Sequence, residues 1–297
     1  MSELTGKKTD LMRIIRVTGM LIFVMFASLM IPYFLGLGRS GFDDPQILQI
    51  LFFYGIFGAV SSIIILLGSL MQLWITKGDE RYGSSILFNS PGESTSPSFL
   101  RKLRTFSNPI GLLMISILIF GTIGIVLGST SQSFTGSVLS VQQFTPGEEL
   151  GFKSFLIPGV ENLGGAAVIV VIILIWTWFA RKSDLSRISF LAGQWAFIII
   201  GYVLYWIANH QLRYGSSDIS IFGQVAPFGL LIAILTLFTG SFIPGWVAHI
   251  SNNFFYEAFK LFSNDITFVF SIGLLVALLI VYFIFFGFLG RKKDDKK

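Results

Sequence analysis

The chain has 297 residues, of which 53% are hydrophobic and only 12% are charged, whereas a soluble domain carries about 25% charged residues. This composition excludes an ordinary soluble enzyme, and the absence of cysteine excludes disulfides and Cys-ligated metal centres. The net charge of +5 does not indicate nucleic-acid binding, because the basic residues gather between apolar segments, as they do in membrane proteins.

Eight apolar segments are long enough to cross a membrane, because a bilayer core of about 30 Å needs a helix of about 20 apolar residues. They are residues 14–36, 47–75, 107–128, 163–180, 188–210, 221–239, 242–262 and 266–289. The sequence therefore predicts an all-α fold, a polytopic membrane protein of about eight transmembrane helices.

The distribution of basic residues gives this protein an orientation. With eight spans, all but four of the 21 Lys and Arg residues fall on one side, and the exceptions are Arg39, Lys153, Arg213 and Lys260. Basic loops stay in the cytoplasm. We therefore expect both termini to be cytoplasmic, and we expect the protein to lie in the plasma membrane.

Three regions follow from this topology. Residues 1–128 contain three transmembrane helices and a polar, Ser-rich and Pro-rich cytoplasmic loop, 77–106. Residues 129–162 are expected to form an outer-side loop that carries an acidic motif. Residues 163–297 are expected to form a five-helix part that carries the candidate site.

The chain contains two histidines, and each has a notable partner on its own helix. His210 ends the fifth span, four residues after Trp206, and His249 lies within the seventh, four residues before Asn253. Residues spaced by four share a helix face. Ionisable residues inside a membrane are costly and indicate function, although a single His with an Asn also serves as hydrogen-bonding glue between helices.

These pairs form part of an ordered pattern. Trp206-x-x-x-His210 corresponds to an F-x-x-x-H motif, and Thr239-Gly240-Ser241 is followed by His249-x-x-x-Asn253. The pattern resembles the CPBP family of intramembrane glutamate proteases, which includes CAAX prenyl proteases and bacteriocin-processing enzymes. The resemblance covers about a third of the chain, residues 146–255.

Two acids compete for the catalytic position. The family motif E-E-x-x-x-R is similar to Glu148-Glu149-Leu-Gly-Phe-Lys153, with Lys where the family has Arg. Glu161 is expected at the outer start of the fourth span, where it needs no re-entrant segment to reach His210. The motif favours Glu148, which would require residues 147–158 to fold back as a short helix, and the predicted position favours Glu161.

The resemblance implies peptide hydrolysis without a cofactor. The glutamate would act as a general base on water, and His210 would help to position that water. His249 and Asn253 would donate hydrogen bonds to the oxyanion. Lys153 would support the motif by pairing with Glu149. Its ammonium group is a point charge and does not form the bidentate hydrogen bonds that Arg would form. An outer-facing site suits an exported peptide or the outer end of a membrane protein as the substrate.

Three alternatives stay open. His210, His249 and a Glu are a ligand set typical of catalytic zinc. The second alternative is a catalytically inactive CPBP-like protein with a binding or scaffold role. A transporter, with the same polar residues along its pathway, ranks last because no pair of matching broken spans indicates inverted repeats.

Overall fold

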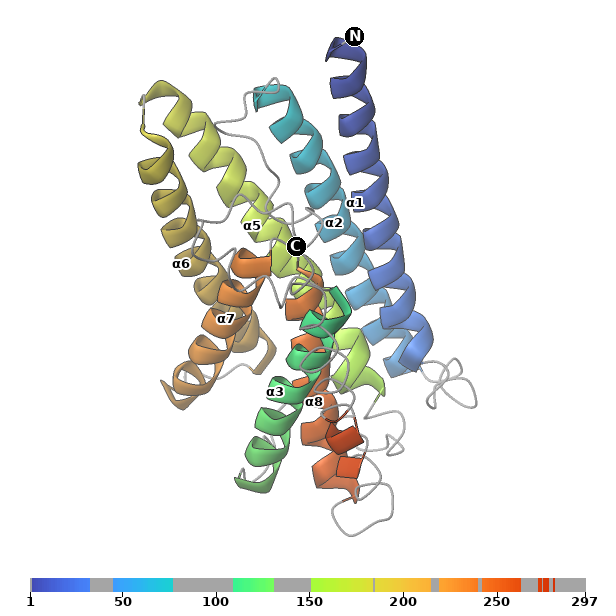
Figure 1. Ribbon diagram of the computed structural model, residues 1–297. Helices are drawn as coiled ribbons and strands as arrows, with labels where there is room; N and C mark the ends of the chain where they lie inside the picture. Colours follow the sequence, from blue (N-terminus) through green and yellow to red (C-terminus); the bar gives the residue numbers. More distant parts are fainter. Residues whose placement is uncertain are drawn as a thin grey trace, which may run out of the picture.

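Nearly every described residue of the computed structural model is helical and none is in a strand (Figure 1). The predicted all-α class is thereby confirmed for the described part of the chain. The structure describes residues 2–32, 45–76, 109–130, 151–183, 185–214, 219–239 and 242–262, together with helical positions 272–273, 275–277 and 280.

The helices follow the predicted spans closely in most places. Five predicted segments agree with the observed helices to within about one helical turn, while the first helix begins near the N-terminus rather than at residue 14. The predicted span 266–289 lies largely outside the described residues. The helices are α1 (Ser2–Pro32), α2 (Pro45–Thr76), α3 (Pro109–Thr130), η3 (Phe152–Leu156), α5 (Ile157–Lys182), α6 (Arg187–Tyr214), α7 (Ile219–Thr239) and α8 (Ile243–Phe262).

The acidic region before α5 corrects one prediction. Residues 151–162, expected to belong to an outer loop, are helical, and η3 runs directly into α5. Residues 151–158 therefore do not fold back, while residues 147–150 of the predicted fold-back lie outside the described residues. The π-helical turn is closed by the Ile157 N–H bonding to the Phe152 carbonyl. Pro158 then falls in the first turn of α5, where a missing N–H costs little. The helix therefore continues through the proline.

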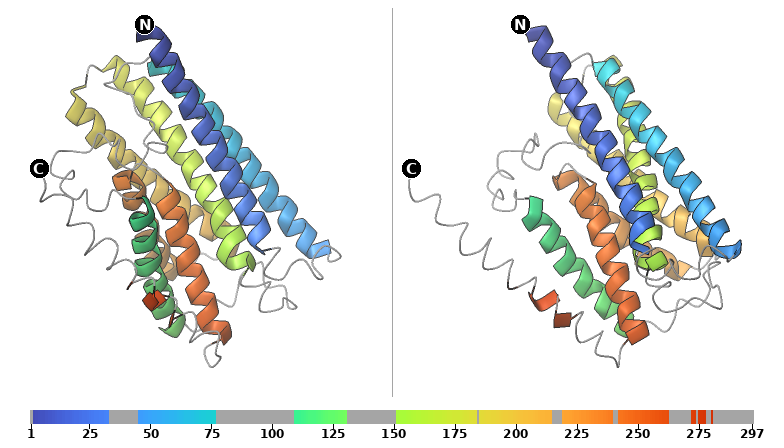
Figure 2. Two further views of the ribbon diagram at one scale, coloured as in Figure 1. Left: turned by 45° about the vertical axis from the view of Figure 1, so that its right-hand side comes forward. Right: turned by 90° about the vertical axis from the view of Figure 1, so that its right-hand side faces the viewer.

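Helix α5 is the centre of the bundle. It packs against α1, α2, α6 and α8, while α3 lies along α8 and α7 lies along α6 (Figures 1 and 2). The start of α1, the end of α2 and the connection from α5 to α6 lie at one end of the molecule (Figure 1). Arg181 donates a hydrogen bond of 2.5 Å to the Ile75 carbonyl and thereby joins α5 to α2 at that end.

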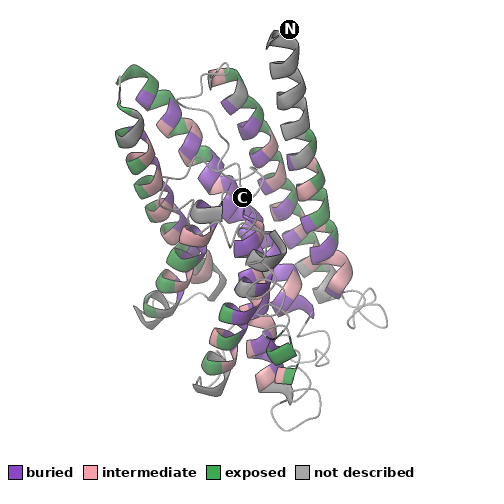
Figure 3. Ribbon diagram, in the orientation of Figure 1, coloured by how far each residue is buried: buried purple, intermediate pink, exposed green. Residues whose placement is uncertain are grey.

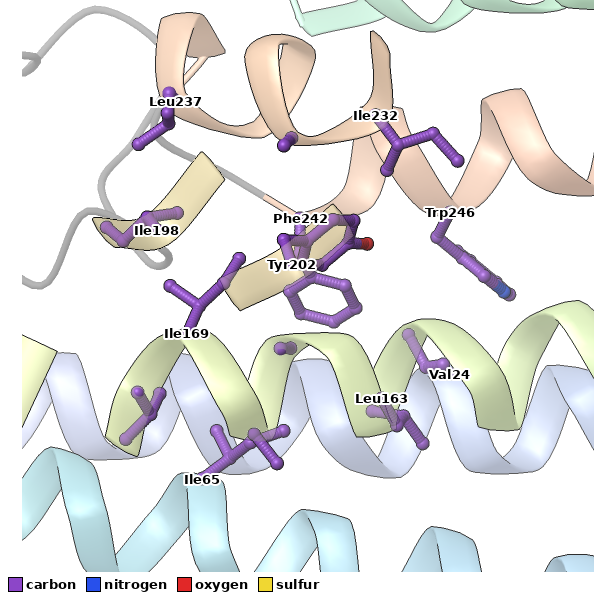
Figure 4. Packing of buried hydrophobic residues seen from close by; sticks show 14 of the residues in the cluster. Val24, Ile65, Leu163, Ile169, Ile198, Tyr202, Ile232, Leu237, Phe242 and Trp246 are labelled. Carbon is purple, nitrogen blue, oxygen red and sulfur yellow. The ribbon is translucent and has the colours of Figure 1, made fainter. Parts of the chain in front are cut away.

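The main apolar core lies between α5 and the helices around it. Figure 4 shows Ile169 of α5 on the side of Tyr202 of α6 and Ile232 of α7, and Leu163 of α5 beside Val24 of α1. In Figure 3 the buried residues run along α5 toward its junction with α8. This junction is where the polar residues described below are enclosed.

Among the residues that the structure describes, three helices are long and apolar enough to cross a membrane: Leu51–Gln72, Phe152–Lys182 and Ser189–Leu212. Large apolar side chains such as Phe52, Ile175 and Phe197 are exposed on them, as expected of faces that meet lipid. These features support an integral membrane protein.

Candidate active site

Glu161 and His249 meet in the interior of the bundle. Glu161 is in the second turn of α5 and His249 in the second turn of α8. His249 Nε2 lies 3.9 Å from Glu161 Oε2. Only 2% of Glu161 and 3% of His249 is exposed. A carboxylate and an imidazole enclosed together at this separation form a pair suited to proton transfer or to holding a water between them.

Asn162 binds the other ring nitrogen of His249. Its Nδ2 lies 2.8 Å from His249 Nδ1 and donates a second hydrogen bond of 2.7 Å to the Pro158 carbonyl. Its Oδ1 accepts from the Tyr202 hydroxyl at 3.4 Å. Sequence reasoning gave no role to Asn162 or Tyr202, and the position of Asn162 directly after Glu161 was the one available signal.

Asn253 completes the cluster from α8. Its Nδ2 lies 3.3 Å from His249 Nε2, as the four-residue spacing predicts, and donates to the Lys153 carbonyl at 3.0 Å. Asn253 Oδ1 accepts from Asn252 at 3.1 Å. The amide of Asn253 is therefore fixed between η3 and the His249 ring.

Trp206 separates the two histidines. Its ring centroid lies 4.7 Å from that of His249, edge to face, and 5.3 Å from that of His210. His210 Nδ1 is 2.9 Å from the Trp206 carbonyl, and Phe228 packs edge to face on both Trp206 and His249. In the described geometry His210 thus meets the cluster through the Trp206 ring.

Two adjacent glycines bring α6 close enough to complete this arrangement. A Cβ on Gly164 would overlap the Tyr205 hydroxyl, and a Cβ on Gly165 would lie 2.6 Å from the Tyr202 ring. With hydrogen in these places, Tyr205 donates a hydrogen bond of 2.8 Å to the Glu161 carbonyl. Small residues at helix contacts allow such close approach in membranes.

A second ionic contact lies at the start of the α5 segment. Lys153 Nζ, on the π turn η3, is 3.6 Å from Glu257 Oε2 on α8. The expected partner of Lys153, Glu149, lies outside the described residues, as do Glu148, Gly240 and Ser241. The structure therefore brings together Glu161, His249, Asn253 and Trp206, with Lys153 at the edge of the cluster.

The zinc alternative, taken with Glu161 as its acid, does not fit the described geometry. Within the described part of the chain, no group of three His, Asp or Glu side chains is placed to hold a metal ion. His210 and His249 each pack on Trp206, and His249 Nδ1 faces an amide. The set of His210, His249 and Glu161 is therefore not arranged as a ligand sphere.

No family model, no curated protein and no solved structure matches the chain. The resemblance to the CPBP family accordingly rests on the motifs quoted above.

Proposed function

We propose that the protein is an intramembrane peptide hydrolase, similar to the CPBP glutamate proteases, in which Glu161 is the general base. The contact between the Glu161 carboxylate and the His249 ring carries this proposal. Ionisable groups are expensive inside a membrane and are retained there for function. The motif-based choice of Glu148 remains the competing assignment.

The contacts of Glu161, His249 and Asn253 support a role for these residues in the three elements that peptide hydrolysis requires. Glu161 takes a proton from water as the water oxygen attacks the substrate carbonyl, and it returns that proton to the leaving amine. His249 Nε2 and Asn253 Nδ2 are 3.3 Å apart. One oxyanion can accept from both at about 2.9 Å when Nε2 carries a proton. We assign His210 to holding Trp206 in place.

The proposed topology has eight spans with both termini cytoplasmic in a plasma membrane. Glu161 is separated from the basic end of α5, at Arg181 and Lys182, by roughly 30 Å of helix at 1.5 Å per residue. That length equals the thickness of a bilayer core. A site near the outer face suits an exported peptide or the outer end of a membrane protein.

One observation favours a second candidate, a catalytically inactive relative with a binding or scaffold role. Both ring nitrogens of His249 face amide groups, and almost none of Glu161 or His249 is exposed. These contacts also stabilise the packing of α5 on α8. A peptide reaches the cluster only if the surrounding helices separate.

The test compares the wild type with single variants. Each purified full-length protein, in liposomes, is incubated with a complex peptide mixture, and new peptide termini are identified by mass spectrometry. We expect the wild type to create new peptide termini and Glu161→Gln to create none. Glu80→Gln, a control in the predicted cytoplasmic loop, should create the same termini as the wild type. If cleavage is lost in Glu148→Gln and retained in Glu161→Gln, the general base is Glu148. No new termini with the wild type would support the inactive relative.

A further inference from the structure

The orientation of the Asn162 amide is determined by its other contacts. The Pro158 carbonyl accepts a hydrogen bond from Nδ2 at 2.7 Å, so this atom carries hydrogens, and the Tyr202 hydroxyl donates to Oδ1 at 3.4 Å. The group that faces His249 Nδ1 at 2.8 Å is therefore the NH2 group. It donates, and Nδ1 accepts.

The amide on the other side of the ring is fixed in the same way. Asn253 Nδ2 donates to the Lys153 carbonyl, and its Oδ1 accepts from Asn252. His249 thus has an NH2 group beside each nitrogen, while a neutral imidazole has one acceptor and one donor. The contact at Nδ1 is the shorter, 2.8 Å against 3.3 Å at Nε2, so Nδ1 takes the acceptor role.

We infer that Asn162 is a positioning residue that holds His249 in its neutral tautomer with the proton on Nε2. Nε2–H and the Asn253 NH2 group then lie side by side as two donors, and the carboxylate oxygen Oε2 of Glu161 lies 3.9 Å from Nε2, longer than a direct hydrogen bond. His249 is consequently a hydrogen-bond donor, and the role of base falls to Glu161. The use of these donors in catalysis rests on the proposed function, whereas the tautomer itself does not.

The second histidine provides an internal reference. The Trp206 carbonyl is an acceptor only, so His210 Nδ1, 2.9 Å away, carries the proton. The two histidines of this chain are therefore expected in opposite tautomers.

Nitrogen NMR of full-length protein labelled at histidine tests the inference directly, because the chain has two histidines. At mildly alkaline pH in nanodiscs, we expect one ring with Nε2–H and one with Nδ1–H, assigned with His210→Gln. A wild-type His249 signal with Nδ1 protonated would overturn the inference.

Variants at position 162 provide the second arm. Asn162→Asp replaces the donor with an acceptor, so the proton of His249 should move to Nδ1, and Asn162→Leu should give a mixture of tautomers. Asn209→Asp, which places the same new charge on α6 beside His210, should leave His249 unchanged. An unchanged His249 signal in both Asn162 variants would contradict the inference.

The outcome is separable from the proposed function. If the tautomers are as expected and no peptide is cleaved, the hydrolase proposal fails and the role of Asn162 stands. If Glu161→Gln abolishes cleavage and the His249 proton is on Nδ1, the hydrolase proposal survives and the role of Asn162 falls. In an active enzyme, Asn162→Asp should lower kcat by 10-fold or more with little change in KM.

Discussion

His249 Nε2 on α8 lies 3.9 Å from Glu161 Oε2 on α5, and both side chains are buried. Removal of one buried polar partner leaves the other without compensation. We expect Glu161→Gln and His249→Gln each to lower the free energy of unfolding, and the pair to show a coupling of about 0.5–3 kcal/mol. Unfolding by SDS in mixed micelles measures this double-mutant cycle.

A control cycle uses Glu161→Gln with Ser69→Ala. Ser69 is on α2, bonded to its own helix at the Ile65 carbonyl. These two changes should add to within about 0.5 kcal/mol. Equal coupling in the two cycles would mean that the contact between Glu161 and His249 has no energetic significance.

Gly164 and Gly55 should respond oppositely to the same substitution. Alanine is favoured over glycine inside a helix by about 1 kcal/mol, and a Cβ at Gly55 meets nothing within 4 Å. Gly55→Ala should therefore keep or raise Tm. Gly164→Ala should lower Tm, because the new methyl group overlaps the Tyr205 hydroxyl and displaces α6 from α5. Thermal unfolding in detergent measures both, and a rise in Tm for Gly164→Ala would refute the close approach of these helices.

Trp206 should matter far more to stability than an exposed tryptophan. Its side chain is fully buried between the two histidines and Phe228. Trp206→Ala should cost about 3–5 kcal/mol of unfolding free energy. Trp178, which is 55% exposed, is the matched control, and Trp178→Ala should cost clearly less in the same SDS unfolding assay. Similar losses for both would contradict the position of Trp206.

The ion pair of Lys153 with Glu257 should contribute modestly, since the Lys153 side chain is 28% exposed. Glu257→Gln should change the unfolding free energy by no more than about 1 kcal/mol. Lys153→Glu places like charges together and should destabilise the protein further. The exchanged pair, Lys153→Glu with Glu257→Lys, should restore most of the loss in Tm. No recovery in the exchanged pair would indicate that the two side chains do not interact.

The proposed orientation is open to chemical labelling because the natural chain contains no cysteine. A single cysteine at Ser183, after the end of α5, should react with an impermeant thiol reagent only when the cytoplasmic face is exposed. A cysteine at Lys153, on the π turn at the other end, should react from the outside of intact cells. The opposite pattern would invert the topology and place the site near the cytoplasm.

The sequence determines the local features of this protein. Apolar run length predicts α2, α3, α6, α7 and α8 to within about a turn, because an apolar segment satisfies its backbone polar groups internally by forming a helix along its whole length. The four-residue spacing likewise predicts that Asn253 lies beside His249 and Trp206 beside His210. Both are consequences of helix geometry.

The start of α5 shows where composition misleads. Glu161 and Asn162 are polar, and with Pro158 and several glycines they are typical of a loop, yet they lie inside a helix. The Asn162 amide is hydrogen-bonded to His249 and Tyr202, and the Glu161 carboxylate lies beside His249, so the partners of both residues come from other helices. A short stretch of sequence around Glu161 does not indicate these partners, because they lie on helices that are distant in the chain.

Tertiary structure alone decided which groups meet. The contact of Glu161 with His249 depends on how α5 packs on α8, and the approach of Tyr202 depends on small residues at Gly164 and Gly165. Asn162 acquires its role only through this packing. The sequence set which side chains each helix face carries, because that follows from 3.6 residues per turn. The register between neighbouring helices decided which of these side chains touch, because the register is determined by the packing of whole helix faces against each other.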